Sequence, residues 1–189
     1  LDGNEARWSV PFPGEPDTHH AFVIGYSHDG RMAVTQNAGL VVVWNLADGG
    51  VVRRFDVEGA WGYMSASFSP DGKTLLTSGR SGTLQLWDMA TGERGKSRVL
   101  SSVYSACADI SPDGKRIAAS VPWGVAILDA GTLEVVREVR TFGMAHPDWG
   151  WVRWSRDGAW AVASRGPAIV SVDPEGKRET VHFLGGAQN

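Results

Sequence analysis

The chain has 189 residues, of which 42% are hydrophobic and 21% charged, and 18 basic against 21 acidic side chains give a formal net charge of −3. This composition suits a chain that folds around a core, and it excludes a disordered or collagen-like protein. A single Cys excludes an internal disulfide, and the apolar runs are far shorter than the roughly 20 residues that span a bilayer. Because the charges are balanced and scattered, we expect neither nucleic-acid binding nor membrane insertion.

Short strands separated by tight turns follow one another along the chain, and no stretch has the periodicity of a helix. Four turns share one pattern, with Asp residues spaced by 42, 42 and 44 positions: Ser27-His28-Asp29-Gly30, Ser69-Pro70-Asp71-Gly72, Ser111-Pro112-Asp113-Gly114 and Ser155-Arg156-Asp157-Gly158. A second landmark ends 16 or 17 residues after each turn Asp: Trp44-Asn45, Trp87-Asp88, Leu128-Asp129 and Val172-Asp173. The pattern predicts four copies of one structural unit.

Each unit is expected to form a four-stranded antiparallel sheet. In the second unit the predicted strands are 63–69, 74–78, 83–88 and 98–102. In the shared turns, Asp accepts hydrogen bonds from the backbone ahead of it and Gly tolerates positive φ. We therefore predict structural turn roles for Asp29, Gly30, Asp71, Gly72, Asp113, Gly114, Asp157 and Gly158. A unit of about 42 residues that is apolar on both faces must stack on its neighbours to bury them.

The second unit resembles the WD40 repeat over residues 68–73 (FSPDGK) and 84–92 (LQLWDMATG), and all four units share its spacing. The resemblance implies an all-β fold, with residues 1–189 forming a single segment of a WD40-like β-propeller. Its predicted parts are an orphan outer strand at 6–12 and four four-stranded blades at 18–57, 58–102, 103–142 and 143–184.

The units also depart from the WD40 pattern. Gly59-Ala60 stands where WD40 units usually carry Gly-His, and Arg80-Ser81 stands where they carry an Asp. In the family these residues join the Trp and a hydroxyl in a buried hydrogen-bonded set. We therefore predict blades that are held mainly by packing, with Trp87 as a large packing element.

The orphan strand leaves the number of blades open. The predicted strands number 17, which do not divide into whole blades of four. Three arrangements remain: a piece of a longer propeller, a half-propeller that pairs with a second copy or another chain, and a self-contained four-blade ring. An open arc would expose an apolar blade face at each end, so a larger or partner-completed ring is favoured.

One rim of a propeller carries the loops between blades and the turns between second and third strands, and ligands usually dock there. Alignment of the units predicts a partner-binding set on that rim: Trp61, Tyr63, Arg80, Trp123, His146, Asp148, Trp149 and Arg165, with His19 and His20 nearby. Aromatic and Arg side chains commonly anchor protein interfaces. The competing interpretation for any single Trp is that it fills a gap between blades.

Other chemically active residues receive structural interpretations. No His or Cys spacing indicates a metal site, and we predict neither a metal nor a cofactor. Cys107 falls in an inner strand, where a free Cys acts as a small buried hydrophobe. Asp109 and Arg153 occupy the same place in the third and fourth units, and we predict that they line the channel and pair across adjacent blades.

The WD40 resemblance implies a scaffold or regulatory role. We predict a non-catalytic protein-interaction module that is part of a larger protein or assembly, binds protein partners, and is cytoplasmic since no targeting signal is visible. The alternative is a propeller hydrolase or lyase with His19, His146, Asp148 or Arg165 at a rim pocket. That alternative requires titratable groups from several blades to converge on one pocket.

Overall fold

Sixteen strands make up the regular structure of the described residues. The computed structural model describes residues 22–37, 39–57, 65–79, 81–100, 107–140, 150–165, 168–175 and 177–183. The strands are β1 (Phe22–Tyr26), β2 (Met32–Asn37), β3 (Leu40–Asn45), β4 (Val51–Asp56), β5 (Ser65–Phe68), β6 (Thr74–Ser78), β7 (Thr83–Asp88), β8 (Arg94–Val99), β9 (Ala108–Ile110), β10 (Arg116–Val121), β11 (Gly124–Asp129), β12 (Val135–Arg140), β13 (Trp151–Trp154), β14 (Ala161–Arg165), β15 (Ala168–Val172) and β16 (Glu179–Phe183).

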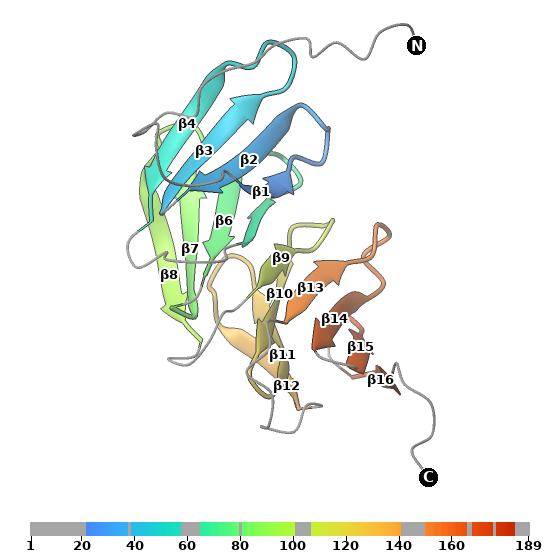
Figure 1. Cartoon of the computed structure of the whole chain (residues 1–189). Helices are drawn as coiled ribbons and strands as arrows, with labels where there is room; N and C mark the ends of the chain where they lie inside the picture. The colour runs from blue at the N-terminus through green and yellow to red at the C-terminus, as the bar shows by residue number, and fades with distance from the viewer. Residues whose placement is uncertain are drawn as a thin grey trace, which may run out of the picture.

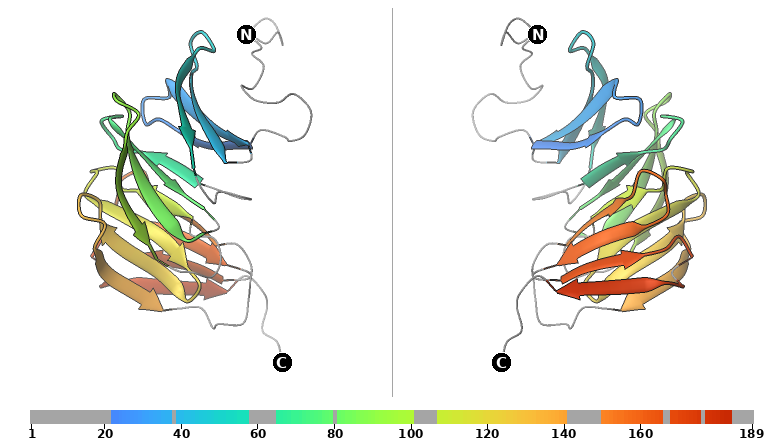
Figure 2. Two further views of the ribbon diagram at one scale, coloured as in Figure 1. Left: turned by 90° about the vertical axis from the view of Figure 1, so that its left-hand side faces the viewer. Right: turned by 90° about the vertical axis from the view of Figure 1, so that its right-hand side faces the viewer.

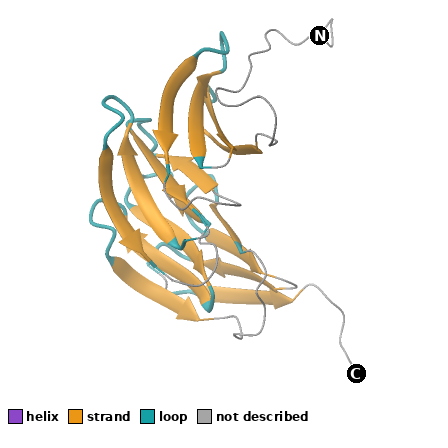
Figure 3. Cartoon of the chain, turned by 60° about the vertical axis from the view of Figure 1, so that its left-hand side comes forward, coloured by secondary structure: helices purple, strands orange, loops and turns teal. Residues whose placement is uncertain are grey.

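These strands form four antiparallel sheets of four consecutive strands each, which we call blades 1 to 4. The inner strands β1, β5, β9 and β13 contact one another in that order. The blades follow one another around an arc, with blade 1 at one end and blade 4 at the other (Figures 1 and 2). Every described element is a strand or a loop (Figure 3). The predicted fold, an all-β propeller with four-stranded blades, is confirmed.

The outer strand of blade 2 differs from the prediction. It was expected at 98–102, but β8 starts at Arg94. The Asp88 N–H donates to the Glu93 carbonyl and the Gly92 N–H donates to the Asp88 carbonyl, which closes a tight turn directly after β7. Strand pairing therefore starts at once, with Arg94 opposite Trp87. The predicted orphan strand at 6–12 lies outside the described residues.

The Asp-Gly turns are built alike in all four blades. In blade 1 the Ser27 hydroxyl donates to Asp29 Oδ1 at 2.6 Å, and the Arg31 N–H donates to the same oxygen at 3.0 Å. Gly30 has a φ of 69°, a conformation that residues with a side chain rarely adopt. The Ser and Asp side chains make the corresponding hydrogen bonds in the turns of blades 2, 3 and 4. Local sequence chemistry thus fixes the link between the first and second strand of every blade.

These turns predict a pH dependence of stability. In each turn the Ser hydroxyl, followed by the backbone N–H two residues after the Asp, lowers the pKa of the Asp carboxyl. A pKa that is lower in the folded state contributes stability above the unfolded-state pKa, and this contribution is lost as pH falls through the folded-state pKa. We expect the free energy of unfolding, measured by urea titration, to fall below about pH 4.

A matched variant tests the cause of that fall. Replacing the four turn serines by Ala removes the hydroxyl donors, and the loss of stability below about pH 4 should become smaller than in the parent. The four substitutions are Ser27→Ala, Ser69→Ala, Ser111→Ala and Ser155→Ala. An equally steep acid loss in this variant would show that the hydroxyl bonds do not lower the Asp pKa values.

The core formed by the described residues consists of three clusters, each between two successive blades. Between blades 1 and 2, Val34 and Phe55 pack against Phe68, Leu75 and Trp87. The second cluster joins blades 2 and 3 around residues such as Leu76 and Ile117, and the third joins blades 3 and 4. Each blade therefore depends on its neighbours for burial, as expected for stacked repeats.

Trp87 combines packing with a buried hydrogen bond. Its ring centroid lies 4.9 Å from that of Phe55 in blade 1, and its Nε1 donates to Thr77 Oγ1 at 2.9 Å. Trp44 in blade 1 donates to Thr35 Oγ1 at 2.6 Å in the same way. Packing was the predicted link between blades, and the structure adds this Trp to Thr hydrogen bond within each of the two blades.

Candidate interaction surfaces

One position on each inner strand faces the next blade, and we call its occupants the slot residues. They are Gly25, Ser67, Asp109 and Arg153, which pair with β2, β6, β10 and β14 at the same register. Because the register is the same in every blade, the four side chains can be compared directly. They differ in size, charge and hydrogen-bonding capacity, so each blade-to-blade contact has its own chemistry.

Two slot residues link three blades through hydrogen bonds. Ser67 Oγ donates to Asp109 Oδ1 at 2.7 Å and accepts from the Ile110 N–H at 3.0 Å. Asp109 Oδ2 accepts from the Trp154 N–H at 2.8 Å, and the Asp109 carbonyl accepts from Trp154 Nε1 at 3.0 Å. Both carboxylate oxygens are therefore paired, as a partly buried charge requires. Blades 2, 3 and 4 are joined near the axis by this set.

The predicted pairing of Asp109 with Arg153 is wrong. Asp109 does bond across blades, but to Ser67 and Trp154, and these partners occupy both of its oxygens. Arg153 Nη1 instead donates to the Val152 carbonyl at 3.1 Å and lies 4.0 Å from the sulfur of Cys107. Cys107 itself is buried in the cluster between blades 3 and 4.

Most of the predicted rim set lies outside the described residues. This holds for Trp61, Tyr63, Arg80, His146, Asp148 and Trp149, and for the nearby His19 and His20. Arg165 ends β14, where its backbone pairs with Ala168, and its side chain is not described.

Trp123 is the described member of the rim set. It lies in the turn between β10 and β11 and packs, partly buried, against the cluster between blades 2 and 3. The guanidinium of Arg140 lies 5.7 Å from its ring centroid, and its buried Nε1 has no hydrogen-bond partner among the described residues. This packing matches the gap-filling interpretation of the residue. This indole N–H, unpaired within the described part of the chain, is a donor that a ligand could use.

Two pockets lie between blades at opposite rims. A pocket of about 260 Å³ is lined by residues of blades 1 and 2, with Thr77 and Trp87 at its buried side and Arg94 at its exposed side. A second pocket of about 470 Å³ is formed by the Asp-Gly turns of blades 2 and 3 together with Ala130 and Gly131. Pockets of this size can hold a side chain or a small polar group.

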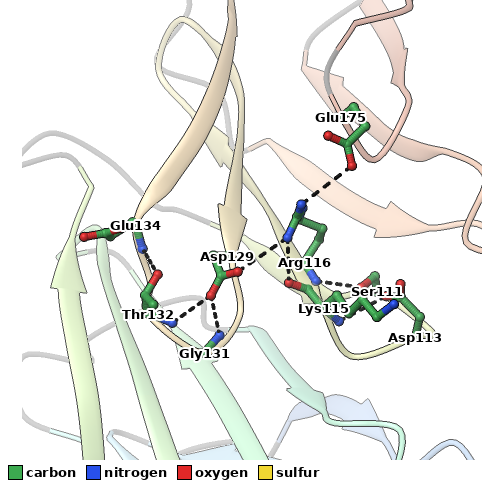
Figure 4. A network of polar contacts seen from close by, with 9 residues as sticks. All are labelled: Ser111, Asp113, Lys115, Arg116, Asp129, Gly131, Thr132, Glu134 and Glu175. Carbon is green, nitrogen blue, oxygen red and sulfur yellow. Dashed lines mark hydrogen bonds and ion pairs between the residues drawn. The ribbon is translucent and has the colours of Figure 1, made fainter.

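An ion network ties blade 3 to blade 4 away from the axis (Figure 4). Arg116 of β10 lies 3.4 Å from Asp129 Oδ2 in its own blade and 3.6 Å from Glu175 Oε1 in the turn between β15 and β16. The Thr132 N–H and the Gly131 N–H donate to Asp129 Oδ1 and, in that order, lower the pKa of its carboxyl. The pairs are partly exposed, so each contributes about 0–1 kcal/mol.

Blade 1 has an exposed inner strand at one end of the arc. In the pairing of β1 with β2, Val23 has the place that Ala66 has in the pairing of β5 with β6, and Tyr26 has the place of Phe68. Val23 and Tyr26 are 54% and 61% exposed, whereas their counterparts, which blade 1 covers, are 3% and 0% exposed. We call Val23 and Tyr26 the first end face.

Blade 4 has the corresponding exposure at the other end. In the pairing of β13 with β14, Trp151 has the place that Cys107 has beside β10 in blade 3, and Val162 has the place of Ala118. Trp151 and Val162 are 52% and 40% exposed, whereas their counterparts, which blade 4 covers, are 6% and 0% exposed. We call Trp151, Val162 and the slot residue Arg153 the second end face. Clustered exposed apolar residues of this kind mark contact surfaces.

No group of three His, Cys, Asp or Glu residues with metal-site geometry occurs in the described part of the chain. Within the same ranges, no helix is long and apolar enough to cross a membrane.

Comparison with known proteins gives a family and a fold. Residues 27–187 match the family model described as the cytochrome D1 heme domain. The chain is 33% identical over 112 residues to a ribosome biogenesis protein BOP1 homolog of Chlamydomonas reinhardtii, which covers 56% of the chain and 14% of that protein. It is 28% identical over 95 residues to a bromodomain and WD repeat-containing protein of Dictyostelium discoideum, covering 48% of the chain and 4% of that protein.

Solved structures share the blade arrangement. A chain of the mitotic checkpoint complex has a TM-score of 0.68 at 18% identity, over 87% of this chain and 52% of that one. The β-propeller domain of Cps50 (Swd1) from Myceliophteria thermophila has a TM-score of 0.65 at 16% identity, over 89% of this chain and 58% of that one. The fold is thus that of the WD40 β-propellers. The chain spans little more than half of these structures and a small part of its curated relatives.

The described residues do not fit a haem, the group that the family description names. Haem iron is held by His, Cys, Met or Tyr side chains. Along the described inner strands the candidates are Cys107, which directly precedes β9 and is buried against blade 4, and Tyr26 of β1, which lies on the first end face. Neither of the two pockets described above is lined by any of the four residue types. We therefore assign no role to a haem.

Proposed function

The chain belongs to the cytochrome D1 heme domain family and has the WD40 β-propeller fold, and on this basis we propose that it is a non-catalytic protein-interaction module within a larger assembly. The observation that carries the proposal is the exposure of Tyr26 and Trp151 at positions that are buried in neighbouring blades. Large aromatic side chains in such places bind protein surfaces, because they bury much apolar area at a small entropy cost.

The described polar groups support a structural rather than a catalytic use of this region. Asp29, Asp71, Asp113 and Asp157 are occupied in turn bonds, and Asp109 is occupied between blades. A catalytic site would need free titratable groups from several blades within reach of one pocket. The chain is similar to a chain of the mitotic checkpoint complex, to a ribosome biogenesis protein and to a WD repeat-containing protein. These similarities support a scaffold role. A cytoplasmic location stays a prediction.

Site-specific photo-crosslinking tests the proposal. Benzoylphenylalanine is incorporated at position 151 and, as a control, at position 99, where Val99 is exposed on the outer strand β8. The cells that produce the two labelled variants are irradiated, and the crosslinked proteins are identified by mass spectrometry. The yield of protein adducts at position 151 should be at least about tenfold higher than the yield at position 99. Equal adduct levels at the two positions would contradict an interaction role for the end face.

A further inference from the structure

The pocket of about 470 Å³ between the Asp-Gly turns of blades 2 and 3, which we call the turn pocket, lies at a place that recurs between successive blades. Thr74 lines it and begins the second strand of blade 2, opposite the last residue of the third strand. Met32 and Arg116 begin the second strands of blades 1 and 3 with the same pairing. Because the register is the same, the three blade-to-blade contacts can be compared side chain by side chain.

Two methionines fill this place between blades 1 and 2. Met32 and Met89 both pack in the cluster between these blades, and Met32 Cε lies 3.8 Å from the position of a Cβ built on Gly72 in the turn of blade 2. By register and by position after the third strand, their counterparts between blades 2 and 3 are Thr74 and Ala130. These shorter side chains leave unfilled the space that forms the turn pocket.

An arginine of the chain itself fills the same place between blades 3 and 4 (Figure 4). The Arg116 guanidinium lies between Asp129 of its own blade and Glu175 in the turn that follows β15. Glu175 has the position that Gly131 has in blade 3, and Gly131 lines the turn pocket. The fold therefore already holds a guanidinium at this place in one contact, while the contact between blades 2 and 3 leaves the place open.

The turn pocket has an apolar floor and an acidic rim. Leu86 lines it and is partly exposed, whereas its counterparts Val43 and Ile127 in blades 1 and 3 are fully buried. On the rim, the turn hydrogen bonds of Asp71 and Asp113 use Oδ1, and within the described residues Oδ2 of each has no donor. The Ser hydroxyl in each turn lowers the pKa of both carboxyls, so both are ionised at neutral pH.

We propose that the turn pocket binds an arginine side chain of a partner protein. The aliphatic part of the arginine lies on Leu86, and its guanidinium donates to the carboxylates of Asp71 and Asp113. A planar guanidinium has five N–H donors, so it can serve two carboxylates at once. The proposal rests on the proposed interaction role and adds the chemistry of the partner at a surface separate from the end faces.

Neighbouring cations of the chain leave the pocket open. The Lys96 ammonium donates to the Gly131 carbonyl at 2.7 Å, and Arg53 makes the corresponding bond to the Met89 carbonyl at 3.0 Å between blades 1 and 2. This bond occurs both where the space is filled and where it is open, so it is independent of the occupant. Each turn Asp is also followed two residues later by an exposed lysine, and no ion pair within 4.0 Å joins them among the described residues: Lys73 and Lys115.

Nuclear magnetic resonance of the ¹⁵N-labelled chain tests the proposal. The probe is the peptide acetyl-Gly-Gly-Arg-Gly-Gly-amide, and the backbone N–H signals of Gly114 and Gly131, which line the pocket, report binding. One side chain with partly exposed ion pairs should bind with a dissociation constant of about 1 mM. A peptide with citrulline in place of arginine keeps the shape without the charge, and it should bind at least about tenfold more weakly.

Variants of the chain locate the site. Ala130→Met fills the pocket as Met89 fills the first contact, so it should abolish binding of the arginine peptide. Asp71→Asn and Asp113→Asn keep an oxygen for the turn hydrogen bonds and remove the charges, so together they should raise the dissociation constant about tenfold. Asp29→Asn makes the same change in the turn of blade 1, which does not line the pocket, and should leave the dissociation constant unchanged.

The outcomes separate this proposal from the interaction role at the end faces. Equal binding of the arginine and citrulline peptides overturns it, and so does a dissociation constant that Ala130→Met leaves unchanged. The dispersion of the other N–H signals shows whether each variant is folded. If the arginine peptide does not bind but position 151 still crosslinks to other proteins, the interaction role stands and the assignment of the turn pocket is wrong.

Discussion

Replacing Trp87 by Ala is expected to lower the free energy of unfolding by about 3–5 kcal/mol. Trp87 is buried between blades 1 and 2, where its ring packs on Phe55 and against Phe68 and Leu75. The substitution leaves a cavity in a cluster that holds two blades together, and it also leaves Thr77 Oγ1 without its indole donor. Urea denaturation of the parent and the variant, monitored by far-UV circular dichroism, measures the difference.

A second variant separates the two contributions of Trp87. Thr77→Val removes the hydroxyl that accepts from the Trp87 indole and keeps the shape of the side chain, so it should cost about 1–3 kcal/mol, below the cost of Trp87→Ala. An unchanged urea midpoint for Trp87→Ala would refute the view that packing between blades holds the propeller together.

Asp109→Ala should destabilise the protein by about 3 kcal/mol, because the substitution leaves a buried backbone donor without an acceptor. Asp109 accepts from the Trp154 N–H of blade 4 and from the Ser67 hydroxyl of blade 2, so its removal weakens two blade-to-blade contacts at once. The measurement is the urea midpoint at neutral pH.

The matched control for that variant is Asp109→Asn. The Asn side chain keeps an oxygen for the Trp154 N–H, and its amide can donate to Ser67 Oγ, so the cost should be about 1 kcal/mol or less. Equal stability of Asp109→Ala and the parent would show that the bonds between Asp109 and its neighbours contribute nothing. A large loss in Asp109→Asn would indicate instead that the negative charge itself matters.

The parts of the fold with local determinants could be predicted from the sequence. Each turn from Ser27 to Gly30 and its three counterparts contains its own donors, acceptor and positive-φ Gly within four residues. The period of these turns therefore predicted four copies of one four-stranded unit, and the β6 and β7 bounds in blade 2 agree with the predicted 74–78 and 83–88. The start of β8 was missed because it depends on how tightly the turn after Asp88 closes.

Contacts between blades could not be predicted in the same way. The repeat aligns Ser67, Asp109 and Arg153, and this alignment indicated that they occupy equivalent places. The opposite charges of Asp109 and Arg153, however, suggested the wrong partner for Asp109. Its actual partners are a hydroxyl 42 residues before it and a backbone N–H 45 residues after it. A backbone donor has no sequence signature. The signal that could have identified Ser67 is its position 42 residues before Asp109, which equals the repeat period.

Hydrophobic alternation and turn chemistry act over a few residues, so they specify the strand pattern, the turns and the repetition of one blade. Which side of each blade is covered follows instead from the packing of the blades. Val23 and Ala66 are both small apolar residues at equivalent positions, yet one is exposed and the other is buried. The difference is physical: burial depends on whether another blade stands opposite, and that neighbour comes from a separate part of the chain.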